Sequence, residues 1–205
     1  MLKFHSYKLY SQSRIILFLD DFTIPPGSFY YILGACSAGK SLFLSSIGGE
    51  YTNYKGVITL KNQKLSPGLK HNNILMINND LPIIDKMTVL ENIEIPIGKI
   101  SPIAKKRLLE MAAIVDIIDF LNVKMQICSR SEKMLMYLVR AALVNPYVLL
   151  IDDLDTFFDN NMYSSVHELF AYFQKSGMII IGTGKGVLDN VITYTIKHAE
   201  VVRII

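Results

Sequence analysis

The sequence predicts an α/β fold in which a helical lobe interrupts a mainly parallel core sheet. Two continuous apolar runs, YVLLID (147–152) and MIIIG (178–182), bracket a helical stretch, and such runs are typical of parallel strands buried on both faces. Between about 80 and 145 the pattern is helical, with almost no strand signal. We therefore expect core strands on both sides of this helical segment.

The individual elements follow from residue type and from their terminal signals. Runs rich in Ile, Val, Tyr and Phe predict strands at 3–9, 14–19, 28–33, 56–60, 73–78, 147–152, 178–182 and 191–196. Helices are expected from Gly39 to about Gly48, from Ser101 to Phe120, from Ser129 to Leu143, and from Asn161 to Lys175. Ser101 is a natural cap and Pro102 a natural first helical residue, whereas Gly177 stops the last helix.

The composition argues against a nucleic-acid-binding, membrane-spanning or disulfide-rich protein. The chain has 205 residues and is expected to form one domain, with 1–79 and 146–205 as the core and 80–145 as the lobe. Apolar residues make up 51% and charged ones only 19%, which indicates an apolar interface with a partner. The net charge of +3 is mild and the basic residues are scattered, so nucleic-acid binding is not favoured. No apolar run reaches the length of a membrane span, and two cysteines are too few for a disulfide framework, so a cytoplasmic setting is predicted.

A glycine-rich octapeptide lies between the strand 28–33 and the helix that follows. GACSAGKS fits the phosphate-loop pattern G-x-x-x-x-G-K-S/T, and its residues are Gly34, Ala35, Cys36, Ser37, Ala38, Gly39, Lys40 and Ser41. The glycines let backbone N–H groups turn towards a phosphate, to which the helix N-terminus adds positive potential. Lys40 is expected to reach the β- and γ-phosphates of a nucleotide, and the Ser41 hydroxyl to ligate Mg²⁺.

A magnesium-bound phosphate also needs an acidic anchor at the end of a buried strand. In YVLLIDD, four apolar residues lead to Asp152 at the carboxyl end of a strand, where open α/β sheets bind ligands. Asp152 is therefore predicted to act as the magnesium carboxylate.

The segments around these two motifs resemble the ATP-binding cassette (ABC) ATPases over nearly the whole chain. RAALVNPYVLLIDD (140–153) is similar to the family's R-A-L-V-x-x-P-x-x-L-L-x-D-E run, and YKGVITLKNQKL (54–65) resembles its antiparallel β piece. KMTVLENIEIPI (86–97) is most similar to the FtsE-type cell-division and lipoprotein-export branch. The resemblance implies a P-loop NTPase fold with an N-terminal antiparallel β subdomain and an inserted α-helical lobe. It also implies that Tyr10 stacks on adenine.

The same resemblance implies cofactors and partners. ATP with Mg²⁺ would be held between two cassettes in a head-to-tail dimer, expected here to be a homodimer. The helical lobe would contact an integral-membrane permease-like subunit, of FtsX type in the cell-division case. The protein would then be cytoplasmic and peripheral to the inner face of the membrane through that partner.

Several positions depart from the family pattern. The catalytic Glu is replaced by Asp153, whose carboxylate is drawn back by about 1 Å, a shift that can cost about a hundredfold in rate. The switch His position falls on Gly184, which offers no side chain to a γ-phosphate, although Lys185 beside it is an alternative source of charge. The Q-loop Gln position falls on Asn79, which keeps the amide but loses reach towards magnesium.

The signature motif is altered too. Its Ser-Gly-Gly-Gln/Glu residues correspond to Ser129, Arg130, Ser131 and Glu132, and the D-loop aspartate corresponds to Asp159. Ser129-x-x-Glu132 is also a capping box, which would start a helix whatever its function. Arg130 has two interpretations, a charge offered to phosphate or a side chain that merely fills the space of a glycine.

These features give a leading hypothesis and three alternatives. The leading one is an FtsE-like ATP-binding subunit that binds Mg-ATP and hydrolyses it slowly through Asp153. The alternatives are a pseudo-ATPase adaptor without turnover, an ATPase subunit of a lipoprotein-release or export transporter, and a P-loop kinase. A kinase is disfavoured because the arginines are dispersed rather than clustered in a lid.

Overall fold

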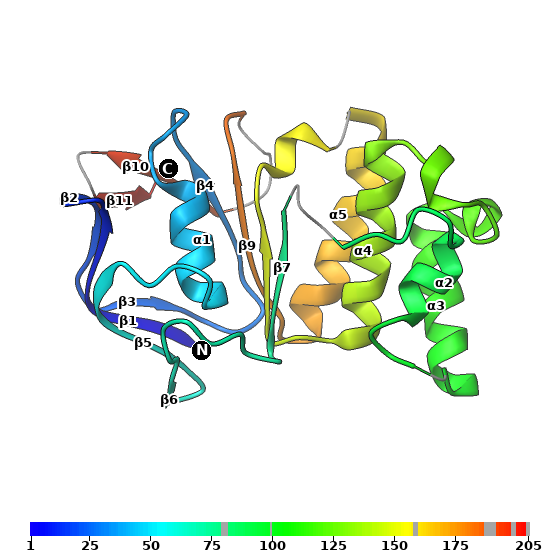
Figure 1. Cartoon of the computed structure of the whole chain (residues 1–205), viewed down its shortest axis with the longest axis horizontal. Coiled ribbons are helices and arrows are strands. Elements are labelled where there is room, and N and C mark those ends of the chain that lie inside the picture. The colour runs from blue at the N-terminus through cyan, green and yellow to red at the C-terminus, as the bar shows by residue number, and fades with distance from the viewer. Residues whose placement is uncertain (79–81, 99, 158–159, 187–191, 198–199, 204–205) are drawn as a thin grey trace. The chain divides into compact units, whose positions relative to one another are not determined.

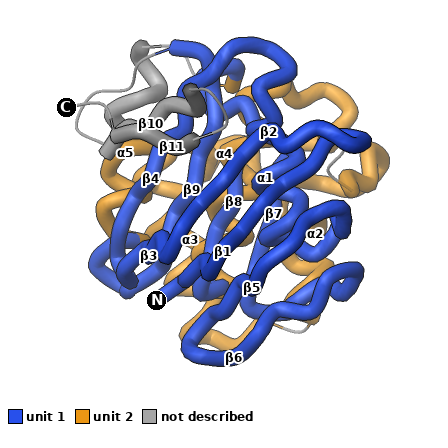
Figure 2. The backbone as a smooth tube through the Cα atoms, turned by 90° about the vertical axis from the view of Figure 1, so that its left-hand side faces the viewer, with its two compact units in different colours: residues 1–78, 146–156, 174–205 blue, residues 79–145, 157–173 orange. Residues whose placement is uncertain are grey.

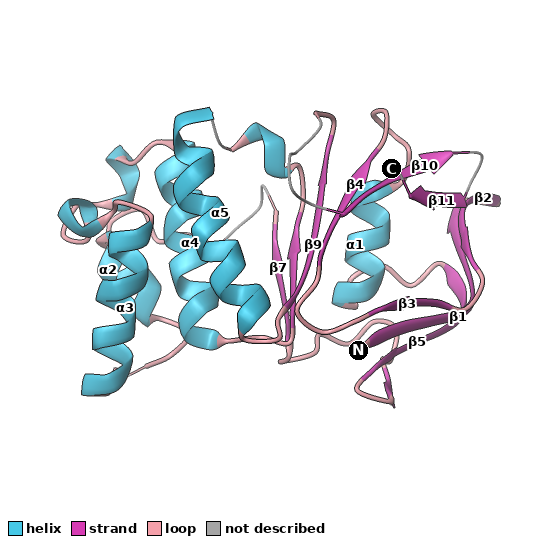
Figure 3. Cartoon of the chain, turned by 180° about the vertical axis from the view of Figure 1, so that it is seen from behind, coloured by secondary structure: helices cyan, strands magenta, loops and turns pink. Residues whose placement is uncertain are grey.

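A computed structural model of the chain describes residues 1–78, 82–98, 100–157, 160–186, 192–197 and 200–203 (Figure 1). For 160–164, 192–197 and 200–203 the description is of the backbone alone. The chain divides into two compact units, each described by itself (Figure 2). Unit 1 comprises Met1–Asn78, Pro146–Thr156 and Gln174–Ile205, and unit 2 comprises Asn79–Asn145 and Phe157–Phe173. Figure 3 distinguishes the helices from the strands; the strands belong to unit 1, and three of the helices lie wholly in unit 2.

The described strands form one mixed sheet. They are β1 (Leu2–Ser11), β2 (Arg14–Leu19), β3 (Phe22–Ile24), β4 (Phe29–Leu33), β5 (Tyr54–Leu60), β6 (Gln63–Lys64), β7 (Ile74–Ile77), β8 (Val148–Ile151), β9 (Ile179–Gly184), β10 (Ile192–Lys197) and β11 (Glu200–Arg203). Their order is β6-β5-β1-β2-β11-β10-β4-β9-β8-β7, with β3 paired to β1. The run β10-β4-β9-β8-β7 is parallel, so the carboxyl ends of these strands meet at one edge of the sheet. β1 runs antiparallel to β2 and β5, between which it lies (Figure 2).

The core of unit 1 forms around helix α1 (Lys40–Gly48). Phe43 of α1 lies 5.5 Å from the Phe4 ring and 6.0 Å from the Tyr7 ring, centroid to centroid, so aromatic residues of β1 cover this helix. The Tyr7 hydroxyl is 2.6 Å from Ser46 Oγ, and burial raises the pKa of Tyr7 far above its usual range. The phenol therefore stays neutral and hydrogen-bonded inside this core.

Unit 2 is built from the helices α2 (Val89–Glu94), α3 (Pro102–Ile114), α4 (Arg130–Val144) and most of α5 (Asn160–Lys175), and side chains cap the first three. Thr88 and Glu91 form a capping box at the start of α2. The buried Asn92 amide donates to the carbonyls of Ile84 and Thr88 and accepts from the Ile84 N–H, which fixes the loop before the helix. The Thr-Val-x-Glu-Asn sequence thus stabilises the start of α2 and the loop before it.

Arg140 of α4 contacts the backbone of α2 at Asn92. Its guanidinium donates to the Asn92 carbonyl and lies 4.6 Å from the Tyr137 ring centroid. Desolvation lowers the pKa of Arg140, which nonetheless remains a cation because the guanidinium is so basic.

The predicted elements are mostly confirmed. All eight predicted strands are present, within a few residues of the expected ends. The predicted helix at 101–120 is too long, because α3 ends at Ile114. Asp116 there adopts a left-handed backbone with φ 55, and the Ile117 N–H bonds to the Ala112 carbonyl, which closes the helix in a Schellman-like turn. Of the described helices, none combines the length and apolar character that crossing a membrane requires.

Candidate functional site

The phosphate loop joins the carboxyl end of β4 to the N-terminus of α1. Ser37 and Gly39 have left-handed backbones, with φ 65 and φ 90, and the Ala38 N–H bonds to the Ala35 carbonyl at 3.2 Å. Gly39 needs glycine for its φ, and a Cβ added there would also lie 2.6 Å from Ile16 Cδ1, the end of a side chain that would have to move. No side chain caps α1 and its first turn carries no acid. Its first N–H groups are therefore left for an anionic ligand.

Lys40, the first residue of α1, folds back across the loop. Its ammonium donates to the Gly34 carbonyl at 2.7 Å and to the Ala35 carbonyl at 3.1 Å. The side chain is 6% exposed, and its stem lies against Gly34. The lysine is thus held beside the loop that it is predicted to serve.

Asp152 follows β8 at the same edge of the sheet, and β9 fixes its orientation. The Thr183 hydroxyl donates to Asp152 Oδ1 at 2.5 Å and accepts from the Asp153 N–H at 3.0 Å. Thr183 is fully buried. Sequence reasoning gave it no role, although a polar residue at the end of the run MIIIG was a usable signal. Its hydroxyl orients the carboxylate predicted to serve magnesium.

Asp153 lies one residue beyond this carboxylate, in a left-handed backbone with φ 50. Its carbonyl accepts from the Thr156 N–H at 2.9 Å and from the Thr156 hydroxyl at 2.8 Å, which closes a tight turn. Aspartate and asparagine tolerate this conformation better than other side chains. The turn holds the Asp153 backbone next to the Asp152 anchor.

Gly184, the last residue of β9, pairs with Leu33 of β4, immediately before the phosphate loop. A Cβ placed on Gly184 would lie 1.8 Å from Tyr31 Oη and 2.5 Å from Asp155 Oδ1. Asp155 Oδ2 accepts from the N–H groups of Lys185 and Gly186, both at 2.7 Å. Two side chains thus occupy the space that any residue larger than glycine needs here, and sequence reasoning missed both.

The altered signature begins α4 in unit 2. Ser129 and Glu132 form the predicted capping box, with the Glu132 N–H donating to Ser129 Oγ and the Ser129 N–H to Glu132 Oε2. The Arg130 guanidinium lies 4.7 Å from the Phe157 ring centroid, and the Ser131 hydroxyl donates to the Phe157 carbonyl at 2.5 Å. Both side chains that replace the glycines of the family pattern are thus engaged with Phe157.

Three predicted site residues remain: two fall outside the described residues, and the third, Tyr10, lies on β1. Asn79 and Asp159 fall outside the described residues. Tyr10 pairs with Ile15 across β1 and β2, next to Ile16, the residue that adjoins Gly39. Its carbonyl accepts from the Tyr51 hydroxyl at 2.5 Å, and Lys55 Nζ lies 5.8 Å from its ring centroid.

Residues 19–155 match the sequence profile described as ABC transporter, and this match covers most of the chain. The chain belongs to the ABC transporter family. Within it, the chain corresponds to the ATP-binding subunit, and the predicted α/β fold of the P-loop NTPase type is confirmed.

Relatives within the family carry several different names. The methionine import ATP-binding protein MetN of Clostridioides difficile is 30% identical over 77% of this chain and 52% of its own length. The cell division ATP-binding protein FtsE of Bacillus subtilis is 29% identical over 72% of this chain and 68% of its own. The chain thus spans about half the length of MetN and about two thirds of FtsE.

Solved structures agree in fold. A putative ABC transporter ATP-binding protein from Pyrococcus furiosus superimposes with a TM-score of 0.81 at 18% identity, over 95% of this chain and 96% of its own. A dimeric ATP-binding cassette with ADP and Pi bound gives a TM-score of 0.78 at 23% identity, over 99% of this chain and 97% of its own.

The described residues fit ATP with Mg²⁺, which ABC ATPases normally bind. The uncapped start of α1 and the backbone of the loop suit the phosphates. The exposed Ser41 on α1 and the oriented Asp152 after β8 supply oxygen atoms, the ligand type that Mg²⁺ prefers. Ser41 and Asp152 stay predicted magnesium ligands, together with Asn79, which lies outside the described residues.

The two cysteines provide a direct readout of nucleotide binding. Cys36 is exposed in the phosphate loop, whereas Cys128 is buried. Burial, and to a smaller extent the negative charge of Glu132, raises the pKa of the Cys128 thiol. Because the thiolate is the reactive form, we expect N-ethylmaleimide to label Cys36 first. Saturating Mg-ATP should slow this labelling at least tenfold, as followed by mass spectrometry.

A Cys36→Ser variant is the control for this measurement. The slow labelling that remains should come from Cys128 and should not respond to ATP. If ATP leaves the rate at Cys36 unchanged in the wild type, the nucleotide does not occupy this loop.

Proposed function

We propose that this chain binds Mg-ATP at residues 34–41 and acts as the cytoplasmic, ATP-driven switch of a membrane complex, with slow hydrolysis through Asp153. ATP binding would close a head-to-tail homodimer, and the complex would resemble the cell-division pair FtsE and FtsX. The observation that carries the proposal is the contrast within unit 1. The phosphate loop, Lys40 and the Thr183–Asp152 link keep the groups expected to bind phosphate and magnesium, whereas the switch position is a glycine.

The surface of unit 2 supports a partner. Most of the large apolar side chains that are exposed in the described part of the chain belong to this unit: Ile84, Ile95, Ile103, Leu109, Ile118, Phe120, Ile127 and Val144. Ile103 is 84% exposed and Ile127 is 72% exposed. Such side chains favour a protein interface, for which we propose the permease-like membrane subunit.

The choice of branch rests on sequence. Relatives named FtsE support the cell-division assignment, as does the similarity of 86–97 to that branch. Thr88, Glu91 and Asn92 also stabilise the start of α2. Because this local role can by itself account for these residues, the segment 86–97 is weaker support for the FtsE branch than the sequence similarity alone. Subunits of import or lipoprotein-export transporters remain the alternative assignment, since MetN is equally similar.

A catalytically inactive adaptor is the second candidate, favoured by Gly184. Its packing against Tyr31 and Asp155 leaves no room for a side chain directed at a γ-phosphate. The two candidates differ in whether Asp153 performs chemistry as a base. Steady-state phosphate release, measured with and without the membrane partner, separates them.

We expect Asp153→Glu to raise phosphate release at least tenfold and Asp153→Asn to lower it to the background of a Lys40→Met variant. The longer side chain brings the carboxylate about 1 Å closer to the attacking water, and errors of that size can cost about a hundredfold. Asparagine tolerates the left-handed backbone at φ 50, so Asp153→Asn should keep the wild-type melting temperature. Equal release by the wild type and all three variants would establish the adaptor.

A further inference from the structure

The antiparallel part of the sheet in unit 1 gathers positive charge that is scattered along the sequence (Figure 2). Residues 1–24 and 54–65, which form β1, β2, β3, β5 and β6, contain six lysines and arginines and two aspartates. This excess of positive charge is larger than the net charge of +3 of the whole chain, so the other residues together are slightly acidic. Both aspartates lie in the turn between β2 and β3, and none of these five strands contains an acidic residue.

Strand register places three of the lysines on one face of this part of the sheet. Lys3 and Lys8 of β1 each lie between two fully buried residues. Because side chains alternate along a strand, both lysines point away from the core around α1. Lys8 pairs with Lys55 of β5, and directly paired residues share a face. Lys3, Lys8 and Lys55 therefore lie together on the outer face of β1 and β5, which we call the basic face.

The charge of the basic face is not balanced by ion pairs. Lys8 and Lys55 are directly opposite each other, an arrangement of like charges that destabilises a sheet. Their ammonium groups lie over aromatic rings instead, Lys8 Nζ at 5.4 Å from the Phe18 centroid and Lys55 Nζ at 5.8 Å from the Tyr10 centroid. Within the described part of the chain, no carboxylate forms an ion pair with Lys3, Lys8 or Lys55. An anionic partner would relieve the repulsion between these lysines.

The acidic side chains near the face are few. Asp21 reaches it from the turn between β2 and β3, and pairs there with His5 Nδ1 at 2.8 Å rather than with a lysine. Glu200 of β11 stands at the register position of Phe18, on the side of β2 away from β1. The positive charge is therefore concentrated on β1 and β5.

The spacing of the lysines fits several anionic groups rather than one. Lys3 and Lys8 are five residues apart in β1, about 15 Å at about 3.3 Å per residue. A single phosphate cannot contact both of them. The headgroups of a bilayer lie side by side in a plane, so that separate headgroups can meet separate lysines.

The other side chains favour a lipid surface over nucleic acid or protein. Lys8 and Lys55 lie over the Phe18 and Tyr10 rings, where the bases of a single strand would have to stack. Lysine is depleted in protein–protein interfaces. At a membrane surface, by contrast, its stem can lie along apolar groups while the ammonium reaches the headgroups. Ile15, which pairs with Tyr10 and is 40% exposed, adds an apolar side chain beside the lysines.

We propose that the basic face binds anionic phospholipids at a membrane surface through Lys3, Lys8 and Lys55. This contact goes beyond the proposed function, in which a partner subunit attaches the chain to the membrane, and it does not rest on nucleotide binding. Each lysine close to an anionic surface contributes about fivefold in affinity. Three lysines give weak, reversible binding that falls as the salt concentration rises.

Co-sedimentation of the full chain with phospholipid vesicles tests the proposal. At low salt and without nucleotide, the chain should bind vesicles that contain phosphatidylglycerol and should not bind vesicles of phosphatidylcholine alone. The double variant Lys8→Met, Lys55→Met should bind the phosphatidylglycerol vesicles at least tenfold more weakly. Methionine keeps an unbranched stem over each ring, and the like-charge pair is removed, so the variant should melt no lower than the wild type.

The double variant Lys86→Met, Lys105→Met is the matched control, because it removes the same charge from two exposed lysines of unit 2. It should bind the vesicles within twofold of the wild type. The proposal is overturned if the wild type does not bind phosphatidylglycerol vesicles or if the two double variants lose affinity equally. Should Lys8→Met, Lys55→Met fail to fold, Lys3→Met alone should weaken binding about threefold, and an unchanged affinity overturns the proposal equally.

Two further probes distinguish the lipid from other anions. A single-stranded oligouridylate and a polyglutamate peptide are titrated into the wild type and into Lys8→Met, Lys55→Met under the same conditions. Both should bind more weakly than the phosphatidylglycerol vesicles do. If either binds more tightly than the vesicles and loses affinity in the double variant, the basic face belongs to a nucleic acid or to an acidic protein, and the lipid assignment is overturned.

Discussion

Replacing Lys40 with methionine is expected to lower the affinity for Mg-ATP at least a hundredfold. The ammonium that lies on the Gly34 and Ala35 carbonyls is predicted to move to the β- and γ-phosphates, and its loss removes the charge-assisted bonds to them. A hundredfold loss corresponds to about 2.8 kcal/mol. Titration calorimetry with AMP-PNP measures it directly.

Methionine is preferred to alanine because it keeps an unbranched apolar stem against Gly34. The variant should therefore fold, and its melting temperature checks this. Lys105→Met, which replaces an exposed lysine of α3, should bind AMP-PNP as the wild type does. An affinity unchanged by Lys40→Met would mean that residues 34–41 are not the nucleotide site.

Restoring a histidine at Gly184 is expected to destabilise the protein without raising ATP turnover. Even the Cβ of Gly184→Ala meets Tyr31 Oη at 1.8 Å and Asp155 Oδ1 at 2.5 Å, and such overpacking costs about 2–3 kcal/mol. Urea unfolding should show this loss for Gly184→Ala and a larger one for Gly184→His. Phosphate release by Gly184→His should not exceed that of the wild type.

Two further variants show whether the cause is steric. Gly186→Ala places a Cβ at 3.5 Å from Asp155 Oδ2, an ordinary contact, and should cost less than about 1 kcal/mol. Tyr31→Phe removes the nearest obstacle, so Gly184→Ala should cost less in that background than in the wild type. Gain of turnover by Gly184→His at unchanged stability would contradict this account.

Local signals in the sequence predicted the elements of the candidate nucleotide site. The phosphate loop was predictable because glycine and small residues at fixed positions set its left-handed backbone between a strand and a helix. The start of α4 was predictable because Ser129 and Glu132 satisfy its first N–H groups from within four residues. The length of α3 was not, because its end depends on a left-handed backbone at Asp116.

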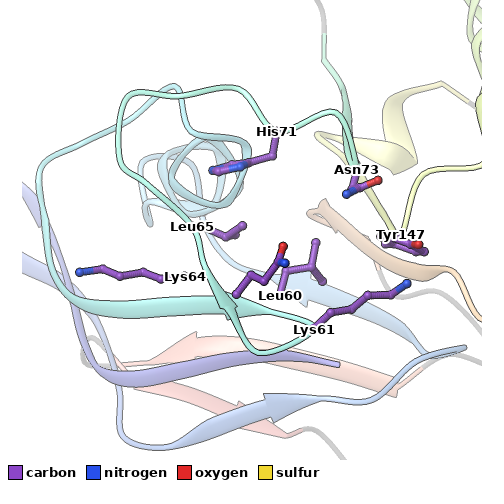
Figure 4. Close-up of a pocket in the computed structure, with 8 residues that line it drawn as sticks. Leu60, Lys61, Lys64, Leu65, His71, Asn73 and Tyr147 are labelled. Atoms are coloured by element: carbon purple, nitrogen blue, oxygen red, sulfur yellow. The ribbon is translucent and has the colours of Figure 1, made fainter.

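The sequence by itself thus determined the shape of the loop at which a nucleotide's phosphates are predicted to bind, since that geometry depends on neighbouring residues in the chain. Only the tertiary structure decided how the carboxylates and the switch position are held. Thr183 orients Asp152 from a neighbouring strand, and Tyr31 and Asp155 occupy the space beside Gly184. A cavity lined by Lys61, His71 and Tyr147, among others (Figure 4), arises in the same way, from segments far apart in the sequence. Contacts of this kind depend on strand order and register, which are set by packing across the whole sheet.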